Sequence, residues 1–386
     1  MKNLKKKLYS LLVNFYMHSC RFFLGIDNKK VVFESFTGKT YSDNPRAISE
    51  ALHEIMPEAK ITWFFNSDKT GVAPDYIVRV TNKLKQKKEL ATAAAVVNNF
   101  QFQMLPKHKK QLFIQTWHGD KGFKTVLHNS PNAPKDRVFF EQIEGNCDYC
   151  VAGSVFGETV YRTAFKYMGD FLKVGSPRND KLMKNNPDEI VDIKKKLGLP
   201  LEAKILLFAP TLRQQNHSDG TAQETGSLDI AEILTLLEEK QNTPWLGLLR
   251  AHPSIVDIQG QSNDARLINV TSYEDMVDLL LISDLLITDY SSSACDFALT
   301  DRPAVLFQSD KKEYLENDRT FCFNMEDSHF HIAETVEQLK DILCGDIFEQ
   351  AVENNKKILE FFGDYETGHA ALSVAEVIKT HLEKLS

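Results

Sequence analysis

The stretch that decides the fold of this chain is Asp284-Leu285-Leu286-Ile287-Thr288-Asp289-Tyr290-Ser291-Ser292-Ser293. Its apolar half has the length of a buried strand, and its polar half joins an acid to a cluster of hydroxyl groups. The apolar periodicity of residues 294–299 then predicts the start of a helix. A buried strand that leads directly into a helix is typical of a parallel sheet.

The start of that helix predicts a binding site. The first N–H groups of a helix are unpaired and, together with the helix dipole, favour an anion. The hydroxyl groups of Ser291, Ser292 and Ser293 can cap the helix and donate to phosphate oxygens, and Asp289 stands at the strand end beside them. These serines and Asp289 are therefore candidates for binding a phosphate-bearing ligand. The alternative is an ordinary serine-capped helix without a ligand.

Short apolar strands alternate with helical patterns along almost the whole chain. This alternation predicts parallel sheets with helices on both faces, and 386 residues divide most naturally into two such α/β domains. The predicted strands are residues 31–36, 61–65, 77–80, 95–98, 112–117, 149–152, 205–209, 245–250, 267–270, 285–288 and 304–308.

The domain boundary is expected near residues 175–180, where glycine and proline interrupt the pattern. We expect an N-terminal segment at residues 1–24 and two doubly wound Rossmann-like domains at residues 25–176 and 177–362. A final helix, within residues 363–386, is expected to cross back to the first domain.

The composition excludes several classes of protein. The hydrophobic fraction of 42% and the charged fraction of 26% are those of a soluble globular protein. The net charge of −7 argues against a nucleic-acid binder, which is normally basic. The six scattered cysteines favour free thiols in a reducing compartment. The isolated Cys147-x-x-Cys150 pair is interpreted as core thiols, because no second pair completes a zinc site.

Charge is concentrated at the N-terminus, where residues 1–24 carry +5 and the remainder of the chain carries −12. These residues are too polar for a membrane span and lack the cleavage site of a signal peptide. Their interleaved apolar and basic side chains predict a basic amphipathic helix, which can lie on an anionic membrane surface. The alternatives are that the helix packs on the protein's own body or frays.

A candidate general base follows a second strand end, in Trp117-His118-Gly119. Open α/β sheets bind ligands at the carboxyl ends of their strands, and the imidazole of His118 can accept a hydroxyl proton near neutral pH. Lys121 and Lys124 are placed to hold phosphate. The alternative is a structural histidine that caps a turn.

Gly175-Ser176-Pro177-Arg178-Asn179-Asp180 is a defined turn that aims Arg178 and Asn179. A guanidinium group held in this way suits bidentate phosphate recognition. The alternative is a plain interdomain turn in which Asp180 is a helix N-cap.

Two more strands end in polar groups flanked by proline, at Ala209-Pro210-Thr211-Leu212-Arg213 and Leu249-Arg250-Ala251-His252-Pro253. Parallel strands place Thr211, Arg213, Arg250 and His252 at the same edge of the second sheet, where the number of cationic groups fits a diphosphate. The alternative is a set of loop residues that share no ligand.

Together these segments resemble the CDP-glycerol glycerophosphotransferase family, which makes teichoic-acid-type polymers. The family's motifs W-H-G, G-x-P-R-N-D, A-P-T-x-R, H-P and L-I-T-D-Y-S-S followed by D-F-A occur here in the same order, over roughly residues 31–385. Ser42-Asp43-Asn44-Pro45-Arg46 is similar to an early S-D-N-P element of the family. The chain departs from the family at residues 120–124, where many members have Thr-Pro-Leu-Lys.

The resemblance implies a GT-B-like architecture, in which two Rossmann-like domains face a cleft, with CDP on the second domain and the acceptor on the first. It implies that His118 deprotonates an acceptor hydroxyl, which attacks the distal phosphorus of CDP-glycerol or CDP-ribitol and releases CMP. His252 is the second candidate catalytic residue. The residues implied to bind the nucleotide are Arg178, Asn179, Thr211, Arg213, Asp289, Ser291 and Ser292.

No cofactor or metal is implied, and no paired carboxylates arranged for Mg²⁺ are apparent. The expected acceptor is a lipid-linked saccharide or a growing polyol-phosphate chain, and the expected location is the cytoplasmic face of the membrane, as a peripheral protein. Two other classes stay open. One is a GT-B glycosyltransferase that uses a nucleotide sugar, since a fold does not determine a function. The other is a non-catalytic subunit that serves as a membrane-bound assembly partner.

Overall fold

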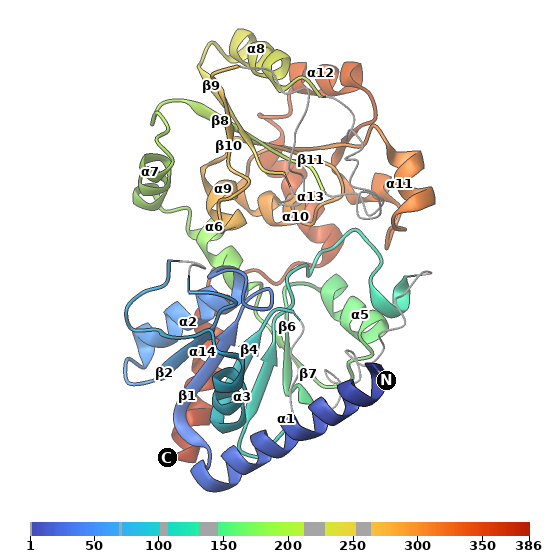
Figure 1. Cartoon of the computed structure of the whole chain (residues 1–386). Coiled ribbons are helices and arrows are strands. Elements are labelled where there is room, and N and C mark those ends of the chain that lie inside the picture. The colour runs from blue at the N-terminus through green and yellow to red at the C-terminus, as the bar shows by residue number, and fades with distance from the viewer. Residues whose placement is uncertain (1, 69–71, 101–106, 131–145, 212–227, 252–263) are drawn as a thin grey trace. The chain divides into compact units, whose positions relative to one another are not determined.

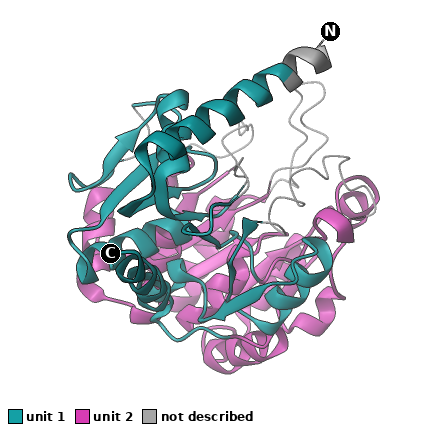
Figure 2. Ribbon diagram, turned by 90° about the horizontal axis from the view of Figure 1, so that it is seen from below, with its two compact units in different colours: residues 1–120, 134–180, 365–386 teal, residues 121–133, 181–364 magenta. Residues whose placement is uncertain are grey.

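The computed structural model describes residues 2–68, 72–100, 107–130, 146–211, 228–251 and 264–386. The chain forms two compact units, coloured separately in Figure 2. Unit 1 contains residues 1–120, 134–180 and 365–386, and unit 2 contains residues 121–133 and 181–364.

Unit 1 is built on a seven-stranded parallel sheet with the strand order β3-β2-β1-β4-β5-β6-β7 (Figure 1). Strands β4 and β5 are buried throughout and mostly apolar, and β1 is buried over its second half, as expected for a sheet that is covered on both faces. The strands are β1 Asp27–Glu34, β2 Lys60–Phe64, β3 Val78–Val80, β4 Ala93–Asn98, β5 Leu112–Gln115, β6 Tyr149–Ala152 and β7 Asp170–Lys173.

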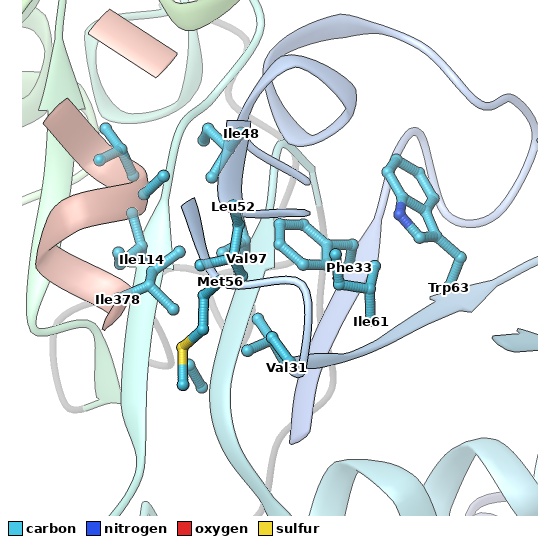
Figure 3. Packing of buried hydrophobic residues seen from close by; sticks show 14 of the residues in the cluster. Val31, Phe33, Ile48, Leu52, Met56, Ile61, Trp63, Val97, Ile114 and Ile378 are labelled. Atoms are coloured by element: carbon cyan, nitrogen blue, oxygen red, sulfur yellow. The ribbon is translucent and has the colours of Figure 1, made fainter. Parts of the chain in front are cut away.

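Helices α2 (Asp43–Ile55) and α14 (Ala370–Leu385) cover one face of this sheet. Figure 3 shows Ile48 and Leu52 of α2 and Ile378 of α14 packed toward strand residues such as Val31 and Val97. Helices α1 (Lys2–Leu24) and α3 (Lys83–Thr92) belong to the other face, where Val32, Val96 and Phe113 form a second apolar cluster. Helix α5 (Val155–Ala164) joins β6 to β7.

Helix α1 has two apolar faces with different environments. Val13, Tyr16, Met17 and Cys20 pack against the second cluster of unit 1, so this side of the helix rests on the protein's own body. The large apolar side chains Leu8, Leu11, Leu12, Phe15, Phe22 and Phe23 are all more than half exposed. Among the residues that the structure describes, no helix combines the length and the apolar run that crossing a bilayer requires.

Unit 2 is built on a six-stranded parallel sheet with the strand order β10-β9-β8-β11-β12-β13. Its core contains strand residues such as Leu206 and Ile287 together with Leu234 and Leu339 from covering helices. The strands are β8 Lys204–Ala209, β9 Trp245–Leu249, β10 Leu267–Asn269, β11 Leu285–Thr288, β12 Ala304–Phe307 and β13 His331–Ala333. The helices are α6 Asp180–Lys184, α7 Pro187–Lys196, α8 Ile230–Gln241, α9 Met276–Ile282, α10 Ser293–Phe297, α11 Lys311–Asn317, α12 Val336–Cys344 and α13 Ala351–Phe362.

Both sheets therefore have the strand order 3-2-1-4-5-6 that is typical of a Rossmann fold, with a seventh strand added in unit 1. The prediction of two parallel-sheet α/β domains is confirmed. In each sheet the strand order reverses between the first and the fourth strand, which are β1 and β4 in unit 1 and β8 and β11 in unit 2. Ligands of this fold bind outside the carboxyl ends of the strands at that switch point.

The units divide the chain differently from the expected boundaries at residues 121–133, 177–180 and 363–364. The short helix Pro177–Asn179 and Asp180 cluster with unit 1 rather than opening the second domain. Residues 121–133 cluster with unit 2, where Phe123 is fully buried and contacts the rings of Phe323 and Phe330. The C-terminal segment from Tyr365 onward, with α14, belongs to unit 1.

Candidate active site

His118 lies just beyond the carboxyl end of β5, beside the switch point of unit 1. Its Nδ1 atom is 2.9 Å from the carbonyl oxygen of Asn99, which follows β4. A carbonyl oxygen can only accept a hydrogen bond, so this contact assigns the proton to Nδ1 and leaves the lone pair on Nε2. Nε2 has no hydrogen-bond partner within the described part of the chain. The ring can therefore act as a base through Nε2.

Aromatic rings surround the His118 imidazole. The ring centroids of Trp117, Phe36 and Phe100 lie 4.1, 5.2 and 5.5 Å from that of the histidine. Burial lowers the pKa of His118 below its ordinary value of 6.5, and the nearby Arg178 lowers it further. The hydrogen bond that His118 donates to the Asn99 carbonyl oxygen and the charge of Asp43 act in the opposite direction. The net result is a neutral imidazole at pH 7, which is the form that accepts a proton.

A buried ion pair supports the peptide of His118. Arg178 Nη1 donates to Asp43 Oδ2 and to the carbonyl oxygen of His118, both at 3.0 Å. The side chains of Arg178 and Asp43 are only 8% and 12% exposed. The guanidinium group that we expected to bind phosphate thus has other partners, because the turn at 177–179 folds onto unit 1.

Asn44 of the Ser42–Arg46 element holds the preceding peptide group, which joins Trp117 to His118. Asn44 Nδ2 donates to the carbonyl oxygen of Trp117, and Asn44 Oδ1 accepts from the backbone N–H of Arg178, both at 3.0 Å. Asp43 and Trp117 have positive φ angles of 67° and 51°, which cost energy in residues other than glycine. This backbone strain is held in place by the hydrogen-bond network, as at many functional sites.

Three residues of this network were not predicted from the sequence to be site residues. Asp43 and Asn44 appeared only in the resemblance to S-D-N-P. Asn99 bonds Phe36 N–H through Oδ1 and Asp43 Oδ1 through Nδ2, and its carbonyl oxygen orients His118. Asn99 could have been found in the sequence because it is a polar residue that directly follows a buried strand.

Asn179 and Asp180 anchor the C-terminal segment within unit 1. The fully buried Asn179 donates through Nδ2 to Glu366 Oε1 at 2.9 Å. The carboxylate of Asp180 accepts the backbone N–H groups of Ala370 and Ala371, both at 2.8 Å. Asp180 thus binds the first N–H groups of α14, a helix 190 residues further along the chain.

In unit 2 three predicted strand ends meet at one edge of the sheet. The parallel pairing aligns Thr288 with Ala209 and Phe208 with Leu249. The carboxylate of Asp289, which is 3% exposed, accepts the backbone N–H of Thr211 at 2.9 and 3.1 Å. Asp289 also accepts the N–H of Tyr290 at 2.6 Å. Asp289 and Thr211 therefore tie the two loops at the switch point together.

Ser291 and Ser292 stand at the start of α10. Ser291 Oγ accepts from the hydroxyl and the N–H of Ser293, at 2.9 and 3.3 Å. The backbone N–H groups of Ser291 and Ser292 and the Ser292 hydroxyl have no hydrogen-bond partner among the residues described. Because α10 is only five residues long, its dipole is small, and these local donors are the groups that an anion would meet.

The remaining candidates have other environments or lie outside the described residues. His252 and Arg213 fall in the segments that the structure does not describe. Arg250 donates to the carbonyl oxygen of Tyr273 at 2.7 Å. Lys121, expected to hold phosphate, has a 2% exposed side chain paired with Asp364 at 2.7 Å. Within the described ranges, no three His, Cys, Asp or Glu side chains are grouped as a metal would require.

Two parallel α/β units with polar groups at both switch points, and a neutral histidine in one of them, define a two-unit α/β enzyme. The sequence matches the family described as CDP-Glycerol:Poly(glycerophosphate) glycerophosphotransferase over residues 14–380. The chain belongs to this family, as its motifs indicated.

Individual relatives agree with this assignment. The chain is 32% identical to the teichoic acid glycerol-phosphate transferase of Staphylococcus aureus (strain NCTC 8325 / PS 47), over 83% of this chain and 84% of the relative. It is 31% identical to the teichoic acid poly(glycerol phosphate) polymerase of Bacillus subtilis (strain 168), over 83% of this chain. That match covers only 45% of the polymerase, so the chain spans less than half of its length.

A solved structure of the wall teichoic acid polymerase TagF has the same fold. It superposes with a TM-score of 0.84 at 26% identity and covers 100% of this chain and 98% of the TagF chain. The two-unit arrangement of parallel sheets is thus a TagF-like fold.

Proposed function

We propose that this protein transfers a polyol-phosphate unit from CDP-glycerol to a hydroxyl of a membrane-linked or saccharide acceptor, with release of CMP, in the synthesis of a teichoic acid or capsule-type polymer. The observation that carries the proposal is the imidazole of His118 at the switch point of unit 1: its pKa is lowered by burial, and its Nε2 has no hydrogen-bond partner among the residues that the structure describes. Membership of the glycerophosphotransferase family supports the choice of donor.

In the proposed reaction, His118 Nε2 accepts the proton of the acceptor hydroxyl. The oxygen attacks the distal phosphorus of the CDP-activated donor, and the bond from this phosphorus to the bridging oxygen breaks. CMP leaves with the electron pair of that bond and the negative charge. The aromatic rings around His118 exclude water, which keeps the imidazole neutral and ready to accept a proton.

Unit 2 is proposed to bind the CDP diphosphate. The N–H groups of Ser291 and Ser292 and the Ser292 hydroxyl are suitable donors to phosphate oxygens, and the bonds of Asp289 to Thr211 hold the adjoining loop. His252 and Arg213 are proposed to neutralise charge on the leaving group. The buried Arg178 and Asn179 are proposed to act on the base side, by holding the His118 peptide and the turn beside it.

A GT-B-like arrangement, in which the two units face a cleft, is part of the same proposal. Two successive units of Rossmann strand order in one chain support it. We also propose that α1 lies on the cytoplasmic face of the membrane as a peripheral anchor. Its exposed apolar side chains and the positive charge of residues 1–24 support this location.

The test of the reaction is His118→Ala in the full chain. We expect no polyol-phosphate transfer, while the melting temperature and CDP binding stay close to those of the unmodified protein. The matched control is His53→Ala, which removes another histidine of unit 1 that stacks on an aromatic ring, Tyr76. Turnover by His118→Ala near the unmodified rate would remove His118 from the mechanism.

The donor is tested by incubation with CDP-glycerol, CDP-ribitol and UDP-sugars and by measuring released CMP or UDP. Release from CDP-ribitol alone would assign a ribitol-phosphate transferase, and release of UDP alone would assign a glycosyltransferase. CDP binding without turnover across a broad acceptor panel would favour the non-catalytic subunit. Parallel reactions with and without a chelator test whether the reaction needs Mg²⁺.

A further inference from the structure

Two residues of opposite charge, Asp120 and Lys121, directly follow Trp117-His118-Gly119. They begin the segment in which this chain departs from the Thr-Pro-Leu-Lys of many family members. The boundary between the two units also falls between them, since residue 120 belongs to unit 1 and residue 121 to unit 2. Each side chain is anchored within its own unit, and the reaction proposed above uses neither of them.

Asp120 is held at the N-terminus of α5. Its Oδ1 accepts the backbone N–H of Gly153 at 2.9 Å, and its Oδ2 accepts the hydroxyl of Ser154 at 2.5 Å. Ser154 is itself the N-cap of α5, so the carboxylate lies where a negative charge is favoured. A Cβ atom added at Gly157 would lie 1.8 Å from Asp120 Oδ1. The glycine at position 157 is therefore required by the position of this carboxylate.

Lys121 is anchored in unit 2 by its side chain and its backbone. Its Nζ atom lies 2.7 Å from Asp364 Oδ1, and its side chain is 2% exposed. Its carbonyl oxygen accepts the thiol of Cys295, which belongs to α10, at 3.2 Å. Burial of a lysine is costly, and a pair of apolar residues is often as stable as a buried ion pair. A contribution to the stability of the fold is therefore a weak explanation for the presence of the Lys121–Asp364 pair.

We propose that Asp120 and Lys121 are positioning residues that fix the peptide carrying His118 from its C-terminal side. Asp120 is two residues from His118, so their Cα atoms are within about 7 Å and a displacement of one reaches the other. Asn44 and Arg178 hold the two peptide groups that flank His118, through the carbonyl oxygens of Trp117 and His118. The imidazole then has little freedom to leave the geometry that proton transfer needs.

The kinetic part of this inference rests on the proposed function. The experiment compares full-length Asp120→Asn and Lys121→Met with two matched controls. Asp229→Asn removes the carboxylate that caps α8, and Lys194→Met removes a buried lysine that donates to the carbonyl oxygens of Leu201 and Ala203. For each protein we measure kcat, the KM for CDP-glycerol, the melting temperature and the NMR titration of the His118 imidazole.

We expect Asp120→Asn and Lys121→Met to lower kcat roughly 10- to 100-fold, because small misplacements of a catalytic group have effects of this size. The KM for CDP-glycerol stays within about twofold, since donor binding is unaffected in a positioning variant. The His118 resonances shift in these two variants alone. Both control variants keep kcat, and Lys194→Met loses stability because the carbonyl oxygens of Leu201 and Ala203 lose their donor.

A kcat equal to that of the unmodified protein in both variants, with unchanged His118 resonances, would overturn the inference. If the unmodified protein itself shows no turnover, the proposed function fails, and the His118 resonances still test the positioning role. If Lys121→Met does not fold, Lys121→Met/Asp364→Leu removes both buried charges. We expect this double variant to fold and to have a kcat at least about 10-fold lower than that of the unmodified protein. A kcat equal to that of the unmodified protein would overturn the role of Lys121.

Discussion

Arg178→Met tests the ion pair on which the geometry of His118 depends. The substitution keeps most of the apolar volume but removes the donors to Asp43 Oδ2 and to the carbonyl oxygen of His118. It leaves the Asp43 carboxylate, whose side chain is 12% exposed, without its cationic partner. Removal of one member of a buried pair costs about 3–5 kcal/mol, because the remaining charge is buried and uncompensated.

That cost is a large fraction of the stability of an ordinary domain, which is about 5–15 kcal/mol. It corresponds to a decrease in melting temperature of roughly 6–20 °C for a unit of this size. The matched control is Arg266→Met, which breaks ion pairs of a partly exposed arginine with Asp264 and Glu238. Pairs of that kind contribute only about 1 kcal/mol or less.

The same substitution changes the proton affinity of His118. The positive charge of Arg178 lowers the pKa of His118, so its removal raises that pKa. The basic form of the imidazole then appears at a higher pH. The acid limb of the profile of kcat/KM against pH reports the deprotonation of the base in the free enzyme. This limb is therefore expected to move to higher pH.

Thermal unfolding and the pH profile, measured below the melting temperature of the variant, check both effects. A loss of stability no larger than that of Arg266→Met would show that the buried pair is not what holds the turn at 177–179. An acid limb that stays in place or moves to lower pH would refute the electrostatic account of the His118 pKa.

Three further predictions concern other residues of unit 1. Asp43→Asn removes a charge that raises the pKa of His118, so the acid limb of the pH profile should move to lower pH; a shift in the same direction as Arg178→Met would contradict this. Gly157→Ala should lower the free energy of unfolding, measured in urea, by about 1–3 kcal/mol, because the added methyl group displaces the Asp120 carboxylate. The same substitution should cost much less in an Asp120→Ala background. Equal losses in the two backgrounds would show that the two groups do not clash. Burial raises the pKa of Glu34 to about 7 from its usual 4.5, so the folded state keeps a proton that the unfolded state releases between these values. The unfolding free energy should therefore fall by up to about 3 kcal/mol as the pH rises from 4.5 to 7. Glu34→Gln should remove that decrease, and an identical slope in the variant would show that Glu34 titrates normally.

Local patterns were sufficient to predict the α/β architecture and most strands. All eleven predicted strands occur, with small differences at their ends. The two strands that were missed, β7 and β13, are the last strands of their sheets, and each has only three or four residues. An edge strand is covered less completely, so Asp170–Lys173 and His331–Ala333 do not show the apolar run that marks a central strand.

The location of the candidate base was also readable from the sequence. Residues that follow a buried parallel strand lie at its carboxyl end, so Trp117-His118-Gly119 had to stand at a ligand-binding edge. The partners of such residues were not readable. Arg178 and Asp43 are 135 residues apart in the chain, and no local pattern shows that their side chains form an ion pair.

The amino-acid sequence by itself determined which segments are strands, the polar residues at their ends and the family to which the chain belongs, because apolar periodicity and short motifs are properties of neighbouring residues. Only the tertiary structure decided the tautomer of His118, the burial of Arg178 and the separate anchoring of Asp120 and Lys121. These properties depend on contacts between distant segments, which exist only after the sheets have formed and excluded water from the side chains between them.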